Sequence, residues 1–160
     1  MSLESVRAWL AAHAPELRLI EGHASTATVA EAAATLGVAP ARIAKTLAVR
    51  AGEETFLLVA RGDARLSNAK SKAAFGARPR MVGPEETPAL TGHPIGGVCP
   101  FGLATPLPVY LDVSLQAFDL VYPAAGARNA SVAVTPARLF ALVGARWVDL
   151  CTLPEPEEPE

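Results

Sequence analysis

The spacing of hydrophobic residues predicts several short helices along the chain. The first follows from an apolar face at helical spacing, formed by Leu3, Val6, Trp9 and Leu10. Other hydrophobic runs begin after a residue that caps helices, and several end at a glycine, as helices commonly do. These helices are predicted over Thr28–Gly37, Pro40–Ala44 and Ser67–Gly76, and from Pro84 and Thr135 onward.

Short runs rich in β-branched and apolar residues predict strands between these helices. Two of them, Thr46–Arg50 and Thr55–Ala60, are separated by a tight turn and should pair as a hairpin. Because strands and helices do not alternate regularly, the pattern favours an α+β fold, a single domain with a mixed, curved, barrel-like sheet flanked by helices. The other strands are expected at Leu17–Ile20, Val109–Asp112, Asp119–Tyr122, Ser131–Val134 and Trp147–Leu150.

The composition is that of an ordinary globular protein. Of the 160 residues, 51% are hydrophobic and 19% are charged, and no apolar run approaches the ~20 residues of a membrane span. The N-terminus lacks the pattern of a secretory signal, so a cytoplasmic location is expected. Cys99 and Cys151 are too few for a disulfide framework, and no ligand cluster has metal-binding spacing. We therefore expect neither a metal nor a cofactor.

Charge is distributed unevenly along the chain. A proline- and glutamate-rich end predicts a disordered acidic tail over residues 153–160, after a folded domain at 1–152. Residues 61–80 form a basic stripe in which Asp63 is the sole acid, and which suits either a polyanion contact or a solvated face. The cations of the basic stripe are Arg61, Arg65, Lys70, Lys72, Arg78 and Arg80.

Lys45 is the first candidate for chemistry. It lies between a predicted helix end and a predicted strand, among apolar neighbours. An ammonium in such a place can offer a strong point charge within a pocket. A lysine that extends from a helix end into solvent would give the same sequence, so residue chemistry alone leaves both interpretations open.

The glycine-rich loop Thr91–Gly102 is the second candidate. Its glycines allow a backbone to approach a ligand closely, although a tight structural loop would need them equally. Its spacing matches neither a P-loop nor G-x-G-x-x-G. Cys99 would need a base to act as a nucleophile, and His93 is the one histidine near it in sequence, so a buried, inert thiol is favoured. His13 and His23 are expected to be structural or exposed.

Three motifs together resemble the YbaK/ProX family, the editing domains associated with prolyl-tRNA synthetase. They are Ala44–Leu47, Gly96–Gly102 and Pro123–Ser131, in the order in which the family has them. The resemblance extends from about Ser2 to Leu150. It implies a free-standing α+β domain of the YbaK type that hydrolyses the carboxylic ester between a wrongly attached amino acid and tRNA.

The resemblance also implies roles for particular residues. Lys45 corresponds to the chief functional lysine, and Gly97 and Val98 would supply backbone N–H groups to an oxyanion. Ser25, Thr26 and Ala27 would border a pocket for a small amino acid such as alanine. Substrate contacts are expected from Thr26, His93, Gly96, Cys99, Gly102 and Ser131. Contacts with tRNA are expected from Arg61, Arg65, Lys70, Lys72 and Arg80.

The implied partners are mischarged tRNA, tRNA(Pro) above all, and prolyl-tRNA synthetase, with no role for DNA or membranes. Two other functions fit the same residues. One is a non-catalytic module of this fold that binds tRNA or a synthetase, and the other is a Cys99-dependent hydrolase of small esters. The preference of this family for either serine or cysteine at position 99 fits a packing or polar-contact role better than an obligatory nucleophile.

Overall fold

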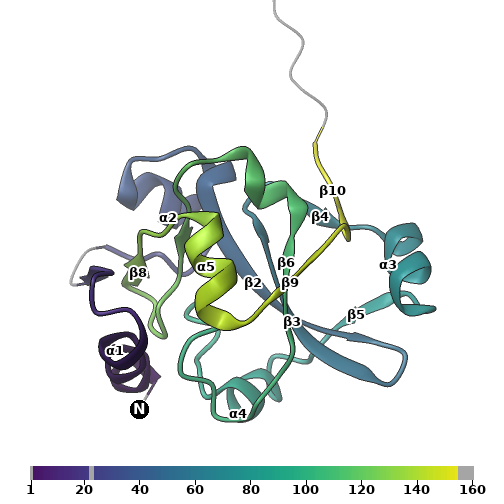
Figure 1. The fold of residues 1–160 in the computed structure, drawn as a ribbon, viewed down its shortest axis with the longest axis horizontal. Coiled ribbons are helices and arrows are strands. Elements are labelled where there is room, and N and C mark those ends of the chain that lie inside the picture. The colour runs from purple at the N-terminus through teal and green to yellow at the C-terminus, as the bar shows by residue number, and fades with distance from the viewer. Residues whose placement is uncertain (1, 22–23, 155–160) are drawn as a thin grey trace, which may run out of the picture.

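A hairpin of two long strands forms the centre of the fold in the computed structural model, which describes residues 2–21 and 24–154. β2 (Ile43–Ala51) and β3 (Glu54–Arg61) pair antiparallel over eight residue pairs, from Ala44↔Arg61 to Ala51↔Glu54 (Figure 1). The predicted hairpin is thus confirmed. β2 begins earlier than predicted, so Lys45 lies inside the strand, opposite Ala60.

The hairpin belongs to a six-stranded mixed sheet. The order is β5-β2-β3-β6-β9, with β7 also paired to β2. β5 (Pro79–Met81) is antiparallel to β2, whereas β6 (Val109–Asp112), β7 (Tyr122–Pro123) and β9 (Arg146–Val148) pair in parallel with their neighbours. The α+β class with a mixed sheet is confirmed. Among the described strands, however, the sheet stays open and does not close into a barrel.

Two short antiparallel ladders lie outside this sheet. β1 (Leu19–Glu21) pairs with β8 (Ala130–Val132). β4 (Arg65–Leu66) pairs with β10 (Cys151–Thr152), which is the last described strand in chain order. The second ladder fixes the segment that follows β3, and this segment carries part of the candidate site.

The helices begin at the caps that the sequence predicts. The side chains of Thr28, Ser67 and Thr135 each accept a hydrogen bond from the backbone N–H three residues later. The predicted helix from Pro84 starts later, at Thr87, and the Pro40 helix is a single 3-10 turn. The helices are α1 (Ser2–His13), α2 (Val29–Leu36), α3 (Asn68–Phe75), α4 (Thr87–Thr91), α5 (Pro136–Val143) and the 3-10 turns η1 (Pro40–Arg42) and η2 (Val113–Ala117).

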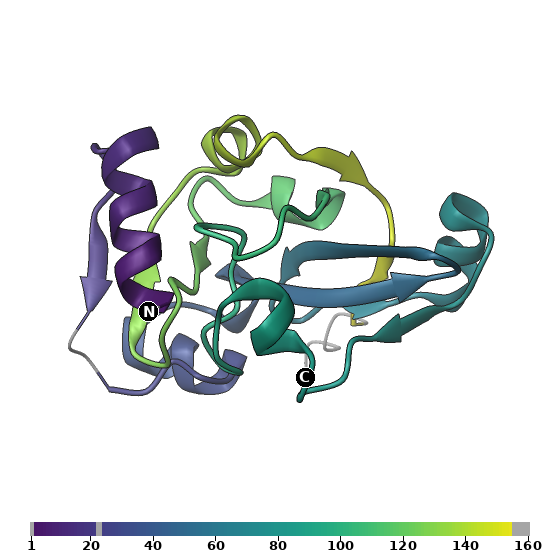
Figure 2. The same ribbon diagram turned by 90° about the horizontal axis from the view of Figure 1, so that it is seen from below.

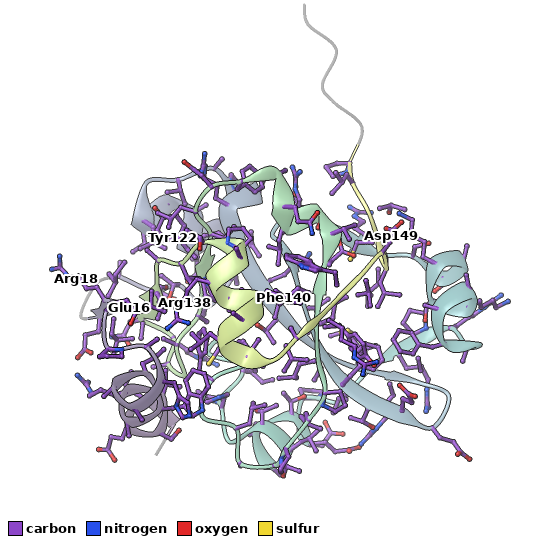
Figure 3. The ribbon with its side chains drawn as sticks, in the orientation of Figure 1. Glu16, Arg18, Tyr122, Arg138, Phe140 and Asp149 are labelled. Carbon is purple, nitrogen blue, oxygen red and sulfur yellow. The ribbon has the colours of Figure 1, made fainter. Side chains whose placement is uncertain are left out.

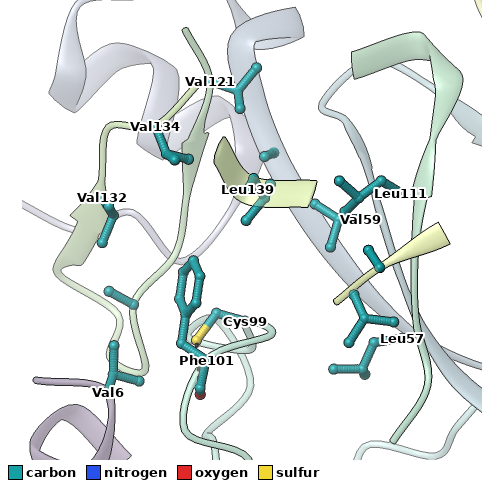
Figure 4. Close-up of a cluster of buried hydrophobic side chains, with 14 of the residues drawn as sticks. Val6, Leu57, Val59, Cys99, Phe101, Leu111, Val121, Val132, Val134 and Leu139 are labelled. Carbon is teal, nitrogen blue, oxygen red and sulfur yellow. Dashed lines mark hydrogen bonds between the residues drawn. The ribbon is translucent and has the colours of Figure 1, made fainter. Parts of the chain in front are cut away.

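The sheet separates two hydrophobic clusters. Successive residues of a strand face opposite sides, so Leu57 and Val59 of β3 enter the larger cluster while Phe56 and Leu58 enter the smaller one. In the larger cluster Phe101 and Cys99 lie between α1, α5 and the sheet (Figure 4). Burial of these side chains stabilises the fold by roughly 25 cal/mol for each Å² of apolar surface removed from water. The same packing fixes the glycine-rich loop against the core.

The helices surround the sheet. α1 and α3 lie at opposite ends of the molecule, and α5 lies over one face of the sheet (Figure 2). The side chains of Arg138 on α5 and Glu16, after α1, point toward each other and join at 2.8 Å (Figure 3). No helix within residues 2–21 and 24–154 is both long and apolar enough to cross a membrane. His23 and residues 155–160, where two sequence predictions fall, lie outside the described residues.

Candidate active site

A cavity of about 250 Å³ opens beside the start of β2. It is enclosed by the N-terminal part of α2, strands β2, β5, β7 and β8, and the glycine-rich loop. Its lining is mostly apolar and small. The lining residues are Thr26, Ala27, Thr28, Val29, Ala32, Ile43, Lys45, Thr46, Ala48, Met81, Val82, Pro84, Thr87, Ile95, Gly96, Val98, Tyr122, Ala124 and Ser131.

Lys45 is held at the wall of this cavity by main-chain oxygens. Its Nζ donates a hydrogen bond to Gly62 O at 3.2 Å and another to Ala64 O. We call these two acceptors the carbonyl cradle. They belong to the turn between β3 and β4, which the ladder with β10 holds in place. Since an ammonium has three N–H donors, the carbonyl cradle leaves one for a ligand in the cavity.

The partly buried position of Lys45 destabilises its protonated, charged form. Burial lowers the pKa of Lys45, while the nearby carboxylate of Asp63 acts in the opposite direction. Asp63 is itself gripped by Arg61 at 2.6 and 2.9 Å, and this contact lowers the pKa of the carboxyl. Asp63 therefore stays ionised, and its negative charge favours the protonated form of Lys45.

The glycine-rich loop packs against the segment before β8 through close backbone contact. Gly97 O accepts a hydrogen bond from Gly126 N at 2.9 Å, and a Cβ at Gly97 would lie 2.6 Å from Ala127 N. The Gly97 N–H donates to Pro94 O at 2.9 Å and is therefore not available to an oxyanion, contrary to the sequence prediction. Val98 N donates to no other described residue, and Val98 lines the cavity.

Within the glycine-rich loop, the side chains of Cys99 and His93 are buried and do not line the cavity. His93 Nε2 is 2.7 Å from Phe101 O, and since a carbonyl can only accept, this nitrogen carries the proton. It therefore cannot take a proton from the Cys99 thiol 3.6 Å away. Burial raises the pKa of Cys99 to about 12 and lowers that of His93. Because neither residue lines the cavity, the structure does not support the substrate contacts that were expected of Cys99 and His93.

The remaining predicted substrate contacts divide into two groups. Thr26, Gly96 and Ser131 line the cavity. Gly102 does not, because it packs against α1, where a Cβ would lie 2.9 Å from Ser5 O. Ser25 is exposed and outside the lining, whereas its neighbour Ala27 is part of the lining.

The basic stripe is dispersed over several elements, and part of it is neutralised. Arg61 pairs with Asp63, and Lys70 donates to Asp149 at 2.8 Å and to Cys151 O at 2.7 Å. Within the described residues, Arg65, Lys72 and Arg80 are exposed and have no carboxylate partner. Their contact with tRNA stays a prediction.

No group of three His, Cys, Asp or Glu side chains in the described part of the chain is arranged to hold a metal ion.

Two features of the site could not be predicted from the sequence. The carbonyl cradle uses backbone atoms of Gly62 and Ala64, and every residue has such atoms. The Thr46 hydroxyl is buried at the cavity wall without any protein partner among the described residues. A buried hydroxyl left unpaired costs about 1–3 kcal/mol, so it marks a place where a ligand atom can bind.

Replacing Cys99 with alanine should leave any activity of the cavity within about twofold of the wild-type kcat/KM. The thiol is buried and protonated at neutral pH, so the variant loses packing rather than a nucleophile, and we expect about 1–2 kcal/mol less unfolding free energy. Steady-state kinetics and thermal denaturation measure the two effects. A Val134→Ala variant, which also loses a buried core side chain outside the cavity lining, serves as the matched control. Loss of activity in Cys99→Ala alone would restore a thiol mechanism.

Comparison with known proteins assigns the chain that contains this cavity to a family. The profile of the aminoacyl-tRNA editing domain matches residues 23–142, which include the cavity and the glycine-rich loop. The chain belongs to the aminoacyl-tRNA editing domain family. The resemblance to YbaK-type domains is thereby confirmed, and the editing domain has a general function in aminoacyl-tRNA editing.

Relatives of the editing domain include both free-standing and embedded forms. The uncharacterised protein YwhH of Bacillus subtilis (strain 168) is 47% identical over 94% of this chain and 98% of its own length. A crystal structure of a proposed trans-editing enzyme for prolyl tRNA synthetase is 37% identical, with a TM-score of 0.85 over 94% of this chain and 97% of that one. Proline–tRNA ligase of Solidesulfovibrio magneticus is 42% identical over 55% of this chain, which is 15% of the ligase.

Proposed function

We propose that the editing domain is a trans-acting deacylase that hydrolyses the ester of a small mischarged amino acid, alanine or one close to it, on tRNA(Pro). The observation that carries the proposal is Lys45, an ammonium with one unused donor at the wall of a small cavity in a chain of this family. The relationship to prolyl-tRNA synthetases supports the choice of tRNA.

Lys45 acts in this proposal as an electrostatic group and not as an attacking one. The aminoacyl ester is already activated, and negative charge develops on its carbonyl oxygen when water attacks. A fixed ammonium beside that oxygen stabilises the transition state more than the ground state. The carbonyl cradle holds Nζ in place before the substrate arrives, so little reorganisation is needed during the reaction.

Three further groups can hold the substrate around this charge. The N–H of Val98 is a second donor for the developing oxyanion. The hydroxyls of Thr46 and Ser131 have no side-chain hydrogen-bond partner among the described residues and lie at the cavity wall. They can bind the α-amino group and the ribose, which leaves the attacking water to be positioned by the substrate's vicinal hydroxyl.

The dimensions of the cavity support a preference for a small side chain. Apolar residues of low volume, Ala27, Ala32 and Ala48, line it together with Val29 and Ile43. A hydrophobic pocket discriminates one methylene by only about 1–3 kcal/mol. We therefore expect the shape of this lining to disfavour larger or cyclic amino acids and to separate amino acids of similar size only modestly.

Deacylation of a matched panel of substrates tests the proposal. tRNA(Pro) charged with Ala, Ser, Thr, Cys or Pro is incubated with the wild-type protein, and the remaining ester is measured with time. We expect the alanyl ester to be hydrolysed fastest and the prolyl ester at least about tenfold more slowly. If the protein hydrolysed none of the five esters faster than buffer alone does, the proposal would be refuted. That result would favour a module that binds tRNA without catalysis.

A further inference from the structure

Arg128 lies at the edge of the cavity and outside the basic stripe. Its Nε donates to Ile95 O at 3.1 Å. Its own carbonyl accepts hydrogen bonds from the backbone N–H and the hydroxyl of Thr26, at 2.6 and 3.1 Å. Because Ile95 and Thr26 both line the cavity, Arg128 is fixed to the cavity wall by its side chain and by its backbone.

The aliphatic part of Arg128 lies against Gly96. A Cβ at Gly96 would stand 3.2 Å from Arg128 Cγ and 2.9 Å from Ala27 Cβ. The φ angle of Gly96 is +90°, where L side chains are strained, so glycine here both makes the turn and leaves room for Arg128. The loop that contains Gly96 and the segment that contains Arg128 therefore form one edge of the cavity.

The guanidinium of Arg128 has donors to spare. Within residues 2–21 and 24–154, its Nη1 and Nη2 groups bond to no other residue, and Arg128 is exposed. Five other described arginines each pair with a carboxylate, namely Arg7, Arg42, Arg50, Arg61 and Arg138. Among the described arginines, Arg128 is the one whose side chain hydrogen-bonds to a cavity-lining residue.

We propose that Arg128 binds the phosphate of the 3′-terminal nucleotide of tRNA and thereby anchors the aminoacyl end of the tRNA at the cavity. This inference rests on the proposed function, because it assumes that the aminoacyl end enters the cavity. A planar guanidinium with two free Nη groups fits the spacing of two phosphate oxygens. The 5′-phosphate of the terminal nucleotide is the anion of the tRNA nearest to the ester. Met81 and Ile95 line the cavity and are exposed, so they offer apolar surface to the nucleoside.

Arg128 and Lys45 would then have different roles in the reaction. Arg128 holds the phosphate outside the cavity, so Lys45 is left to act on the ester inside it. A residue that binds only the phosphate contributes to affinity for tRNA and not to the chemistry of the bound ester. Its loss should therefore raise KM and leave kcat nearly unchanged.

Two substrates that differ in this phosphate test the assignment. Kinetics are measured on alanyl-tRNA(Pro) and on 3′-O-alanyl-adenosine, which has the ester and the nucleoside but no phosphate. For Arg128→Gln we expect KM on the tRNA to rise about tenfold with kcat within about twofold. On alanyl-adenosine the variant should match the wild type, and Arg128→Lys should recover part of the affinity for tRNA.

The matched control is Arg146→Gln. Arg146 is exposed on β9, at the opposite edge of the sheet from β5, and should change neither substrate's kinetics. The slope of log KM against log salt should also fall by about 0.7 in Arg128→Gln, because one phosphate contact is lost. Equal losses on both substrates, or no loss on tRNA, would overturn the assignment. A wild-type protein inactive on both would instead overturn the proposed function, and this inference with it.

Discussion

Replacing Lys45 with alanine is expected to lower kcat/KM for deacylation of alanyl-tRNA(Pro) about a hundredfold or more. The substitution removes the ammonium proposed to stabilise the charge that develops on the ester carbonyl. Loss of one fixed donor to such an oxyanion costs about 10²–10³ in rate in other enzymes. Single-turnover deacylation, corrected for hydrolysis in buffer, measures the chemical step directly.

Two further variants show whether the loss comes from the charge. Lys45→Met keeps most of the side-chain length but donates no proton to Gly62 O or Ala64 O, so it should be as inactive as alanine. Lys72→Ala removes an exposed lysine from α3 and should keep the wild-type kcat. Thermal denaturation should find all three folded at the assay temperature. Full activity in a folded Lys45→Ala protein would remove Lys45 from the mechanism.

Replacing Gly62 with alanine is expected to damage both stability and activity. A Cβ at this position would lie 2.1 Å from Pro40 O and 2.7 Å from Val29 Cγ1, so the backbone of the turn has to move. Overpacking of this kind costs about 1–3 kcal/mol of unfolding free energy. Because the same turn carries the carbonyl cradle, we expect kcat to fall at least about tenfold as Lys45 loses its fixed position. Denaturant unfolding and single-turnover kinetics measure the two effects.

Gly144→Ala provides the comparison. Gly144 ends α5 with a φ of +62° and would place its Cβ with no atom within 4 Å. An L residue in this conformation costs about 1 kcal/mol, so stability should fall while kcat per folded molecule stays the same. If Gly62→Ala merely destabilised the protein in the same manner, the carbonyl cradle would have no part in positioning Lys45.

Local sequence signals were sufficient for the long elements of the fold. The hairpin and the capped helices at Thr28, Ser67 and Thr135 depend on neighbouring residues, so their positions could be predicted. β4, β5 and β10 were not predicted. Strands of two or three residues are too short to establish a periodic pattern, and their pairing is decided by distant parts of the chain.

The candidate site was predictable in part for the same reason. Lys45, Thr26, Gly96 and Ser131 line the cavity as the family resemblance suggested, while their contact with substrate stays a prediction. The resemblance could not show that Cys99 and His93 face the core and not the cavity, because an irregular loop has no periodic pattern that separates inward-facing from outward-facing residues. The engagement of the Gly97 N–H with Pro94 depends on the closed shape of the loop, which composition does not encode.

The ladder between β4 and β10 has a consequence for the order of events during synthesis. β10 is the last described strand in chain order, and its partner β4 directly follows the turn that contains Gly62 and Ala64. The other elements of the cavity therefore leave the ribosome before the strand that supports this turn. We therefore expect a nascent chain without β10 to form the central hairpin while Gly62 O and Ala64 O are not yet held in place for Lys45, which requires Cys151 and Thr152 to emerge.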